Sequence, residues 1–245
     1  MVEQFAYAGR DLEAMLFAEN YHNWILQLFK PFLGKHLVEV GAGIGSFSEL
    51  ILNHIPCETL ALVEPSEALA SELFARTAYY RQHRDITIYK STFIAAAPKI
   101  REKQPPDSII YVNVLEHISD DEHELRVIHQ TLPAGGRLFL FVPAFDWLYG
   151  SFDEAIGHQR RYTKKGLKEK LKRIGFRPLR SCYFDLLGIV PWWISFRLLK
   201  TRELNSDAVK LYDKFVVPLS ARFEGFLPPP LGKNVLLIAE KSQLS

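Results

Sequence analysis

The chain has 245 residues, of which 48% are hydrophobic and 24% charged, so its composition is that of one ordinary globular domain. Thirty basic and 28 acidic side chains leave a net charge of +2, too small by itself to indicate a nucleic-acid or membrane partner. The two cysteines cannot build a disulfide framework or a cysteine zinc site. No signal-peptide pattern opens the chain, and the longest apolar run, 186–196, is too short to span a bilayer. We therefore expect a soluble cytoplasmic protein.

Hydrophobic spacing predicts a helical segment over residues 1–35, followed by short apolar runs that alternate with helical patterns. The runs that predict strands are 36–40, 59–64, 85–90, 108–114 and 137–142, and the clearest helices between them are 45–54, 66–78 and 120–132. Ser119 and Glu122 have the spacing of a capping box at the start of the last of these helices.

The pattern changes after residue 142. In chain order it predicts a polar and aromatic loop at 143–162, a basic helix at 164–174, a strand at 176–184, an apolar segment at 185–199, a helical stretch at 206–226 and a last strand at 234–240. Strands rich in Val, Ile and Leu that alternate with helices indicate a doubly wound α/β fold, with a mostly parallel seven-stranded sheet and helices on both faces.

A glycine-rich turn lies where the first predicted strand meets the first helix. Gly41, Gly43 and Gly45 stand at alternate positions, and Glu39 precedes them inside the strand. Such glycines let a ligand approach the backbone, and open α/β sheets bind ligands at the carboxyl ends of their strands. The dinucleotide pattern G-x-G-x-x-G fits neither register, because serines stand where its third glycine should fall. A carboxylate at position 39 would repel a pyrophosphate but suits a cationic, amino-acid-like ligand.

The E-x-G-x-G-x-G pattern resembles that of class I S-adenosylmethionine-dependent methyltransferases. Two further segments agree with this resemblance. Glu64 ends the second predicted strand, where an acid can accept hydrogen bonds from ribose hydroxyls, and 113–118 (NVLEHI) is similar to a segment of the methyltransferases of ubiquinone biosynthesis and their bacterial relatives. The stretch 157–162 (GHQRRY) resembles bacterial methyltransferases that carry a GHxRRY segment.

The resemblance implies a Rossmann-like fold with S-adenosyl-L-methionine as the cofactor. It divides a single domain, 1–245, into an N-terminal helical lid (1–35), a cofactor-binding core (36–142), an acceptor-side loop and helical insertion (143–233), and a final strand with tail (234–245). Ser91 or Thr92 would take the place of the acid that usually reaches the adenine amino group. The expected cofactor-binding residues are Arg10, Tyr21, Glu39, Gly41, Ala42, Gly43, Gly45, Glu64, Pro65, Ser66, Ser91, Thr92 and Asn113.

On the acceptor side, His158 is the first candidate for a general base and His117 the second, because histidine titrates near neutrality. Two alternatives stay open: these residues only fix the loop through hydrogen bonds, or alignment of donor and acceptor suffices and no base is used. The residues expected to contact the acceptor are Glu116, Tyr149, Arg160, Arg161, Tyr162, Trp192 and Trp193.

The predicted function is methyl transfer to a small-molecule or lipid-like, including lipid-linked, acceptor. The basic stretch 160–180 keeps an RNA methyltransferase as an alternative, although its lysines alternate with apolar residues as on a solvated helix face, so no nucleic-acid partner is expected. A nicotinamide-dependent dehydrogenase of similar fold and a cofactor-binding protein without catalysis also stay open.

The paired tryptophans within 186–196 fit a peripheral membrane contact, an acceptor pocket or a dimer surface equally, and core packing is the default interpretation. His117, His123 and His129 are six residues apart and turn to different faces of a helix, so no metal site is predicted. The oligomeric state stays open.

Overall fold

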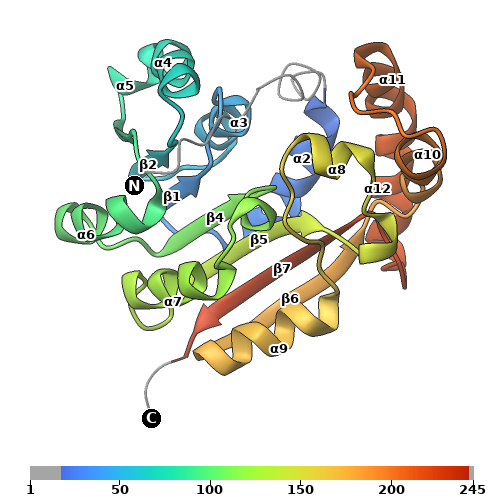
Figure 1. Ribbon diagram of the computed structural model, residues 1–245. Coiled ribbons are helices and arrows are strands. Elements are labelled where there is room, and N and C mark those ends of the chain that lie inside the picture. Colours follow the sequence, from blue (N-terminus) through green and yellow to red (C-terminus); the bar gives the residue numbers. More distant parts are fainter. Residues whose placement is uncertain (1–17, 243–245) are drawn as a thin grey trace.

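The computed structural model describes residues 18–242, which form a seven-stranded sheet in the order β3-β2-β1-β4-β5-β7-β6 (Figure 1). Only β7 runs against the other strands, pairing antiparallel with β5 and with β6. The predicted mostly parallel α/β fold is thus confirmed. The strands are β1 His36–Val40, β2 Thr59–Val63, β3 Asp85–Tyr89, β4 Ser108–Val112, β5 Arg137–Pro143, β6 Phe176–Phe184 and β7 Asn234–Lys241.

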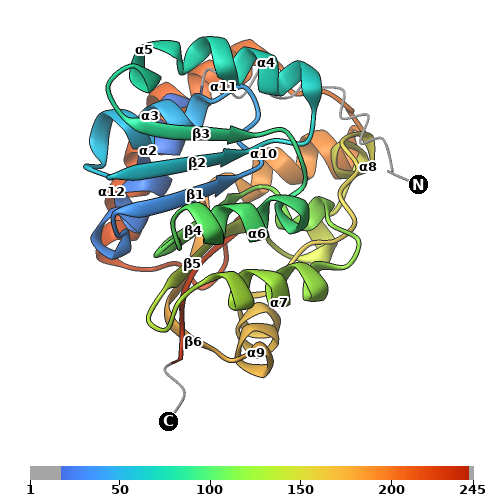
Figure 2. The same cartoon turned by 90° about the vertical axis from the view of Figure 1, so that its left-hand side faces the viewer.

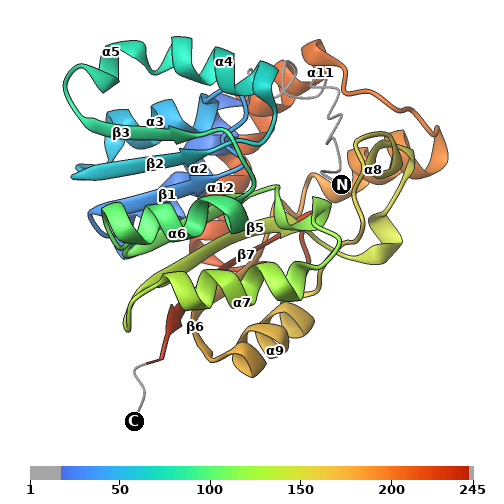
Figure 3. The ribbon, with the colours of Figure 1, turned by 60° about the vertical axis from the view of Figure 1, so that its left-hand side comes forward.

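Helices cover both faces of the sheet (Figures 2 and 3). One hydrophobic cluster joins one face to α6, α7 and α9, and a second joins the other face to α2, α3 and α12. The helices are α2 Glu19–Phe29, α3 Ser46–His54, α4 Glu67–Arg76, α5 Ala78–Arg81, α6 Phe93–Lys103, α7 Asp121–Thr131, α8 Ser151–Ala155, α9 Lys164–Ile174, α10 Ile189–Trp193, α11 Ser206–Leu211 and α12 Val217–Phe226. Two π-helical turns, Ile194–Leu198 and Tyr212–Val216, extend α10 and join α11 to α12.

The central strands are apolar along their whole length because both of their faces are buried. Residues 109–111 of β4 and 138–142 of β5 have no exposed surface. The register then sets the position of the site: Val40 of β1 lies beside Val63 of β2 and Tyr111 of β4, so the residues that follow these three emerge together at one edge of the sheet.

Three local predictions need correction. The helix expected at 66–78 breaks at Thr77 into α4 and α5. The cap of α7 is Asp120, whose Oδ1 accepts from the His123 amide at 2.9 Å, so the capping box expected from Ser119 is one residue out of register. Helix α8 lies inside the predicted loop 143–162, where the Asp153 carboxylate accepts from the Gly150 amide at 2.8 Å and stabilises the first turn.

Helix α2 is anchored by a residue almost 200 positions away in the sequence. Its own N-cap residue provides no side-chain hydrogen bond. Instead the buried Asp213 carboxylate accepts from the backbone amides of Asn20 and Tyr21, at 3.0 and 2.9 Å. The described part of the expected lid is therefore a core helix, with Ile25 completely buried. Arg10, the other residue expected from the lid, lies outside the described residues.

Across residues 18–242, no helix is both long enough and apolar enough to cross a bilayer.

We expect Asp213→Ala to lower the free energy of unfolding by about 1–3 kcal/mol, because it leaves two amides at the start of a buried helix without an acceptor. Urea denaturation followed by circular dichroism measures this change. Asp207→Ala is the matched control, since the Asp207 side chain is 88% exposed and pairs with Lys210 at 3.5 Å. Equal losses in the two variants would contradict the assignment of Asp213 as the cap of α2.

Candidate active site

A cavity of about 480 Å³ opens at the carboxyl ends of β1, β2 and β4. This volume lies in the range of small-molecule sites. The strand order reverses between β1 and β4, which is where open α/β sheets bind their ligands. Figure 3 shows the arrowheads of β1, β2 and β3 pointing toward the end of the molecule where α8 lies. The cavity thus lies between the cofactor-binding core and the acceptor-side insertion expected from the sequence.

The glycine turn connects β1 to α3 with left-handed backbone angles, φ being +70° at Gly41 and +91° at Gly45. A Cβ atom at Gly41 would lie 2.4 Å from Val114 Cγ2, and one at Gly45 would lie 2.8 Å from Leu73 Cδ1. Glycine is therefore required here by both backbone conformation and packing. Gly41 lines the cavity, whereas Gly45 faces α4 and does not.

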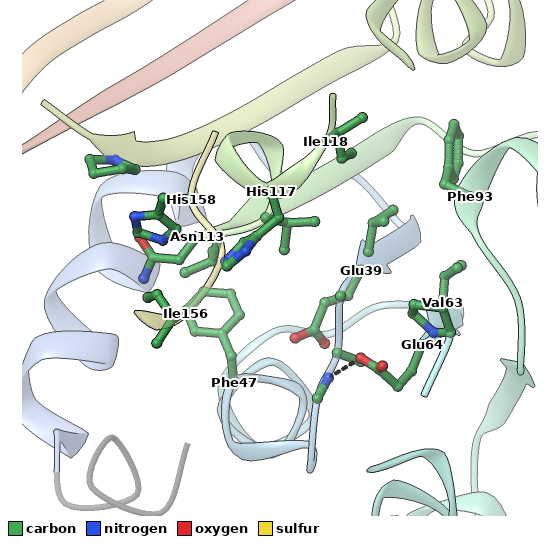
Figure 4. Close-up of a pocket in the computed structure, with 18 of the residues that line it drawn as sticks. Glu39, Phe47, Val63, Glu64, Phe93, Asn113, His117, Ile118, Ile156 and His158 are labelled. Atoms are coloured by element: carbon green, nitrogen blue, oxygen red, sulfur yellow. Dashed lines mark hydrogen bonds between the residues drawn. The ribbon is translucent and has the colours of Figure 1, made fainter. Parts of the chain in front are cut away.

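Glu64 joins the glycine turn to the end of β2. Its two carboxylate oxygens accept from the amides of Gly43, at 2.9 Å, and Ser66, at 2.8 Å. Figure 4 shows Glu64 with one dashed hydrogen bond at its carboxylate. Each carboxylate oxygen has a second lone pair, so Glu64 can still accept hydrogen bonds from a ligand in the cavity. Burial raises the pKa of Glu64, whereas the two amides act in the opposite direction.

Glu39 lies across the glycine turn from Glu64 and also borders the cavity (Figure 4). The residue is 4% exposed, and its carboxylate accepts from the Ser48 hydroxyl at 2.6 Å. Burial raises the pKa of Glu39 to about 8, and the nearby negative charge of Glu64 adds to this effect. An ionised Glu39 is thus poorly compensated by the protein alone, which fits a site for the cationic amino-acid end of a ligand.

At the far end of the cavity the lining is mainly apolar. Phe93 and Ile118 lie there in Figure 4. Thr92, next to Phe93 in the sequence, also lines the cavity. Ser91 does not line the cavity, because its hydroxyl turns to donate to the Thr92 carbonyl at 3.2 Å. Of the two residues expected to reach an adenine ring, the structure therefore brings only Thr92 to the cavity.

The acceptor side is organised around the buried carboxylate of Asp153. His158 Nδ1 lies 2.6 Å from Asp153 Oδ1, and the Arg161 guanidinium donates to both carboxylate oxygens at 2.9 Å. These three side chains are almost completely buried. Charge and hydrogen bonds from His158 and Arg161 keep the pKa of Asp153 below its usual value despite burial. His158 and Arg161 line the cavity, so a histidine held by a carboxylate faces the ligand space.

A second carboxyl lies beside this histidine. His158 Nε2 is 3.7 Å from Glu116 Oε1, and neither Glu116 oxygen has a hydrogen-bond partner among the described residues. Burial raises the pKa of Glu116 to about 7, although positive charge on the His158 and Arg161 side chains opposes the shift. Glu116 is close to the cavity without lining it. It can exchange a proton near neutral pH.

His117 completes this cluster, its ring lying edge-on to His158 with centroids 4.6 Å apart. Burial lowers the pKa of His117 to about 3, so its imidazole is neutral and can act as a metal ligand. Glu116, His117 and His158 each bring one ligand atom into a group within 4.8 Å of one another. A divalent ion such as Zn²⁺ would need each of these atoms at about 2.0–2.2 Å from the ion, so the three side chains would have to move toward one another. The absence of a metal, expected from the sequence, stays a prediction.

Most of the sequence-predicted residues meet at this cavity. Those that line it are Tyr21, Glu39, Gly41, Ala42, Gly43, Glu64, Pro65, Ser66, Thr92, Asn113, His117, His158, Arg161 and Trp192. The structure does not bring Gly45, Ser91, Glu116, Tyr149, Arg160, Tyr162 or Trp193 to its lining.

Three of the residues away from the cavity fix the loop instead. The Tyr149 hydroxyl donates to the His158 carbonyl at 2.8 Å. The Tyr162 hydroxyl donates to Asp121 at 2.8 Å, and the Arg160 guanidinium lies 3.0 Å from the same carboxylate. A loop-fixing role thus describes the contacts of Arg160 and Tyr162, while His158 is both held and open to the cavity.

Sequence reasoning missed Asp153 and much of the apolar lining. Asp153 precedes His158 by five residues in the same polar stretch, and that spacing was the available signal. The missed lining residues include Phe47, Phe93, Ile94, Ile118, Phe152, Ile156, Leu204, Lys233 and Asn234. Nothing in the sequence distinguishes the apolar residues among them from ordinary core positions, and no motif singles out Lys233 or Asn234.

Comparisons with known proteins agree with this geometry. Residues 13–181 match the methyltransferase domain family. The chain is 27% identical, over 241 residues, to the Dictyostelium discoideum protein named probable polyketide synthase 41; the match covers 81% of this chain and 9% of that protein.

Among solved structures, an S-adenosylmethionine-dependent methyltransferase of Thermotoga maritima is similar with a TM-score of 0.59, at 16% identity and 96% coverage of both chains. A mycolic acid cyclopropane synthase in complex with SAH and CTAB is similar with a TM-score of 0.56, at 15% identity, covering 87% of this chain and 81% of that one.

The chain therefore belongs to the methyltransferase domain family. It has the Rossmann-like fold of solved methyltransferases that depend on S-adenosylmethionine. S-adenosylmethionine fits the residues at the glycine turn. Glu64 keeps lone pairs that can accept from the ribose hydroxyls, and the buried charge of Glu39 suits the cofactor's ammonium group. The dehydrogenase considered from the sequence is set aside.

We expect Glu64→Ala to weaken binding of S-adenosylhomocysteine at least tenfold, because the ribose loses a charged acceptor worth about 1.5–3 kcal/mol per hydrogen bond. Isothermal titration measures the change, and a thermal melt verifies that the variant is folded. Glu58→Ala is the matched control, since the Glu58 side chain is 54% exposed and pairs with Lys35 on the surface. Unchanged affinity in a folded Glu64→Ala protein would contradict this role.

We also expect the affinity for S-adenosylhomocysteine to rise several-fold between pH 6.5 and pH 8. Glu39, with a pKa of about 8, is mostly protonated at the lower pH and attracts the ligand's ammonium group only once ionised. Titrations across this range with wild type and Glu39→Gln test the sign. The rise should be absent from Glu39→Gln, and an equal rise in both proteins would assign the effect to another group.

Proposed function

We propose that this methyltransferase acts on a small-molecule or lipid-like acceptor with an apolar body and a nucleophile that must lose a proton, and that His158 accepts this proton. The observation that carries the proposal is the Asp153–His158 pair at the wall of a largely apolar cavity that also contains the glycine turn. Apolar side chains near the pair, Phe47, Phe152 and Ile156 among them, suit an apolar acceptor.

The contacts of His158 support a role as general base. With Nδ1 facing the Asp153 carboxylate, the neutral ring carries its proton on Nδ1, and Nε2 keeps a free lone pair. After proton uptake at Nε2, the imidazolium would lie between Asp153 and Glu116, 2.6 and 3.7 Å away. Two carboxyl groups thus stabilise the charge that develops on the ring.

The remaining contributions are alignment and exclusion of water. When bound, S-adenosylmethionine supplies an electrophilic methyl group on its sulfonium. The protein's part is to hold the cofactor through Glu39, Glu64 and the glycine turn and to hold the acceptor nucleophile in line with the methyl group. An oriented pair of this kind can reach effective molarities of about 10⁵ M or more.

A lipid-like acceptor is favoured by the apolar lining near Trp192 and by the presence, among the similar proteins, of one named as a mycolic acid cyclopropane synthase. An RNA acceptor is less well supported. In the basic stretch 160–180, Arg161 is buried against Asp153, Lys170 pairs with Asp121 at 2.6 Å, and Arg177 pairs with Glu240 at 2.6 Å. The expected cytoplasmic location stays a prediction.

The direct test uses S-adenosylmethionine labelled in its methyl group, incubated with the protein and a bacterial extract. We expect label in the organic, lipid-containing phase or in small apolar molecules. Label confined to RNA would overturn the acceptor class. Label in no fraction, with S-adenosylhomocysteine still bound, would favour a cofactor-binding protein without catalysis.

On the labelled acceptor fraction, we expect His158→Ala to slow methyl transfer about 10²–10⁴-fold, the range typical of a lost general base. Binding of S-adenosylhomocysteine should change less than twofold. Asp153→Asn should lower the rate as well and alter its dependence on pH, because the amide no longer orients the ring or stabilises its charge. A rate reduced less than threefold in folded His158→Ala would show that alignment alone suffices.

Chelation distinguishes the base from a metal at the same histidines. We expect EDTA to leave the rate of methyl transfer within twofold of its starting value. A loss that Zn²⁺ or Mg²⁺ restores would instead assign Glu116, His117 and His158 to a metal site.

A further inference from the structure

Exposed apolar side chains gather in one stretch of the chain. Of the eighteen large hydrophobic residues exposed within residues 18–242, fourteen lie between 186 and 231. They are Leu186, Leu187, Val190, Trp193, Ile194, Leu198, Leu199, Leu211, Phe215, Leu219, Phe223, Phe226, Leu227 and Leu231. Figures 1 and 2 agree that α10, α11 and α12 lie on one side of the molecule, at the right in Figure 1 and behind the sheet in Figure 2.

The helical stretch 206–226 carries these residues as a stripe. Leu211, Phe215, Leu219 and Phe223 are four residues apart, the spacing that places side chains on one helix face, and their exposures are 60%, 61%, 49% and 65%. The opposite face packs on the domain, where Val217 is buried. The helix is therefore apolar on its outer face as well as on its inner face, which burial in the core does not explain.

Helix α10 and its π-helical turn add a second apolar stripe. Val190 and Leu198 are 63% and 60% exposed, and Trp193 lies between them at 42%. On the inner side, the Trp192 ring packs on Phe152 and its indole donates to the Leu148 carbonyl at 3.3 Å. The two stripes together form what we call the apolar surface, namely the exposed residues of 186–231 given above.

Basic side chains border the apolar surface. Its segment contains six exposed cations: Arg197, Lys200, Arg202, Lys210, Lys214 and Arg222. Two of its four acids are turned inward: Asp213 caps α2, and Glu224 accepts from the amides of Asp185 and Leu186. Glu203 and Asp207 remain at the surface. The border is thus net positive.

We propose that the apolar surface docks on the interfacial region of a bilayer that contains anionic phospholipids. Exposed Phe, Leu and Trp beside Lys and Arg are the side chains that insert among lipid headgroups and attract their phosphates. A twofold contact with a second copy of the chain would bring the same net positive borders together, which like-charge repulsion disfavours. Charge complementarity therefore selects a bilayer over self-association.

Docking of this kind would place the active site next to the membrane. Trp192 and Leu204 belong to the same segment of the chain and line the cavity. A membrane-borne acceptor could then reach the cavity beside α10 without crossing water. The inference goes beyond the proposed function and holds for any acceptor, because it concerns binding to lipid alone.

The test is flotation of the full chain with vesicles of phosphatidylcholine alone or with 30% phosphatidylglycerol. We expect at least tenfold more bound protein on the anionic vesicles, and less in 0.5 M than in 0.1 M NaCl because salt screens the attraction. The variant Phe215→Ser/Phe223→Ser should lose most of the binding, and Lys214→Gln/Arg222→Gln should lose the preference for anionic lipid.

Matched controls carry the same changes elsewhere. Phe74→Ser/Tyr79→Ser removes two residues that are 53% and 70% exposed on other helices, and Lys165→Gln/Lys172→Gln removes charge from α9. Both should bind vesicles as wild type does, and all variants should bind S-adenosylhomocysteine normally, which shows that they are folded.

Failure of wild type to bind either vesicle would overturn the docking proposal and leave the proposed methyl transfer intact. Binding that persists in Phe215→Ser/Phe223→Ser would also overturn it. So would a dimer, seen by light scattering, that this variant converts to monomer, because the apolar surface would then be a contact between copies of the chain.

Discussion

The acceptor side of this protein depends on a single carboxylate that water does not reach. Asp153 is fully buried and accepts from the Arg161 guanidinium, the Gly150 amide and the ring of His158. A buried ion pair contributes little net stability, but loss of one partner leaves an uncompensated charge at a cost of about 3–5 kcal/mol. Because Arg161 also donates to the Ala144 carbonyl just beyond β5, the carboxylate fixes the whole segment to the sheet. The position of His158 follows from that constraint.

The site also contains two carboxyl groups whose pKa values burial raises to near neutral pH. The pKa is raised to about 8 in Glu39 and to about 7 in Glu116, in each case mainly by burial. Such groups bind more protons in the folded chain than in the unfolded one, so they make folding less favourable as the pH rises from the ordinary carboxyl range through these values. The protein accepts that cost at Glu39, which lines the cavity, and at Glu116, which lies beside His158. A carboxyl with such a pKa loses its proton when a cationic ligand binds beside it, and it can take up a proton from a neighbouring imidazolium. Its charge therefore depends on the ligand that is bound.

The sequence predicted the sheet well, because the central parallel strands are buried on both faces and have continuous apolar runs in the sequence; β1 and β6 have the predicted bounds. It also predicted the glycine turn and Glu64, since both depend on spacing along one strand and one turn. Other features could not be predicted from the local pattern. Helix α6 contains Pro98, which in a sequence indicates a break, and α8 is stabilised by the Asp153 network. Asp213 caps a helix that begins 194 positions earlier.

The position of β7 has a consequence for how the domain is made. This strand, 234–241, lies between β5 and β6, so β6 has no neighbour in the sheet before β7 is synthesised. The buried Tyr21 hydroxyl likewise donates to Asn234 of β7, at 3.0 Å. During translation, the edge of β5 therefore stays unpaired on the ribosome, and such an edge is a template for wrong strand pairing. The sheet is complete only when β7 has been added. Nascent chains that end before β7 are therefore the ones that need protection from aggregation.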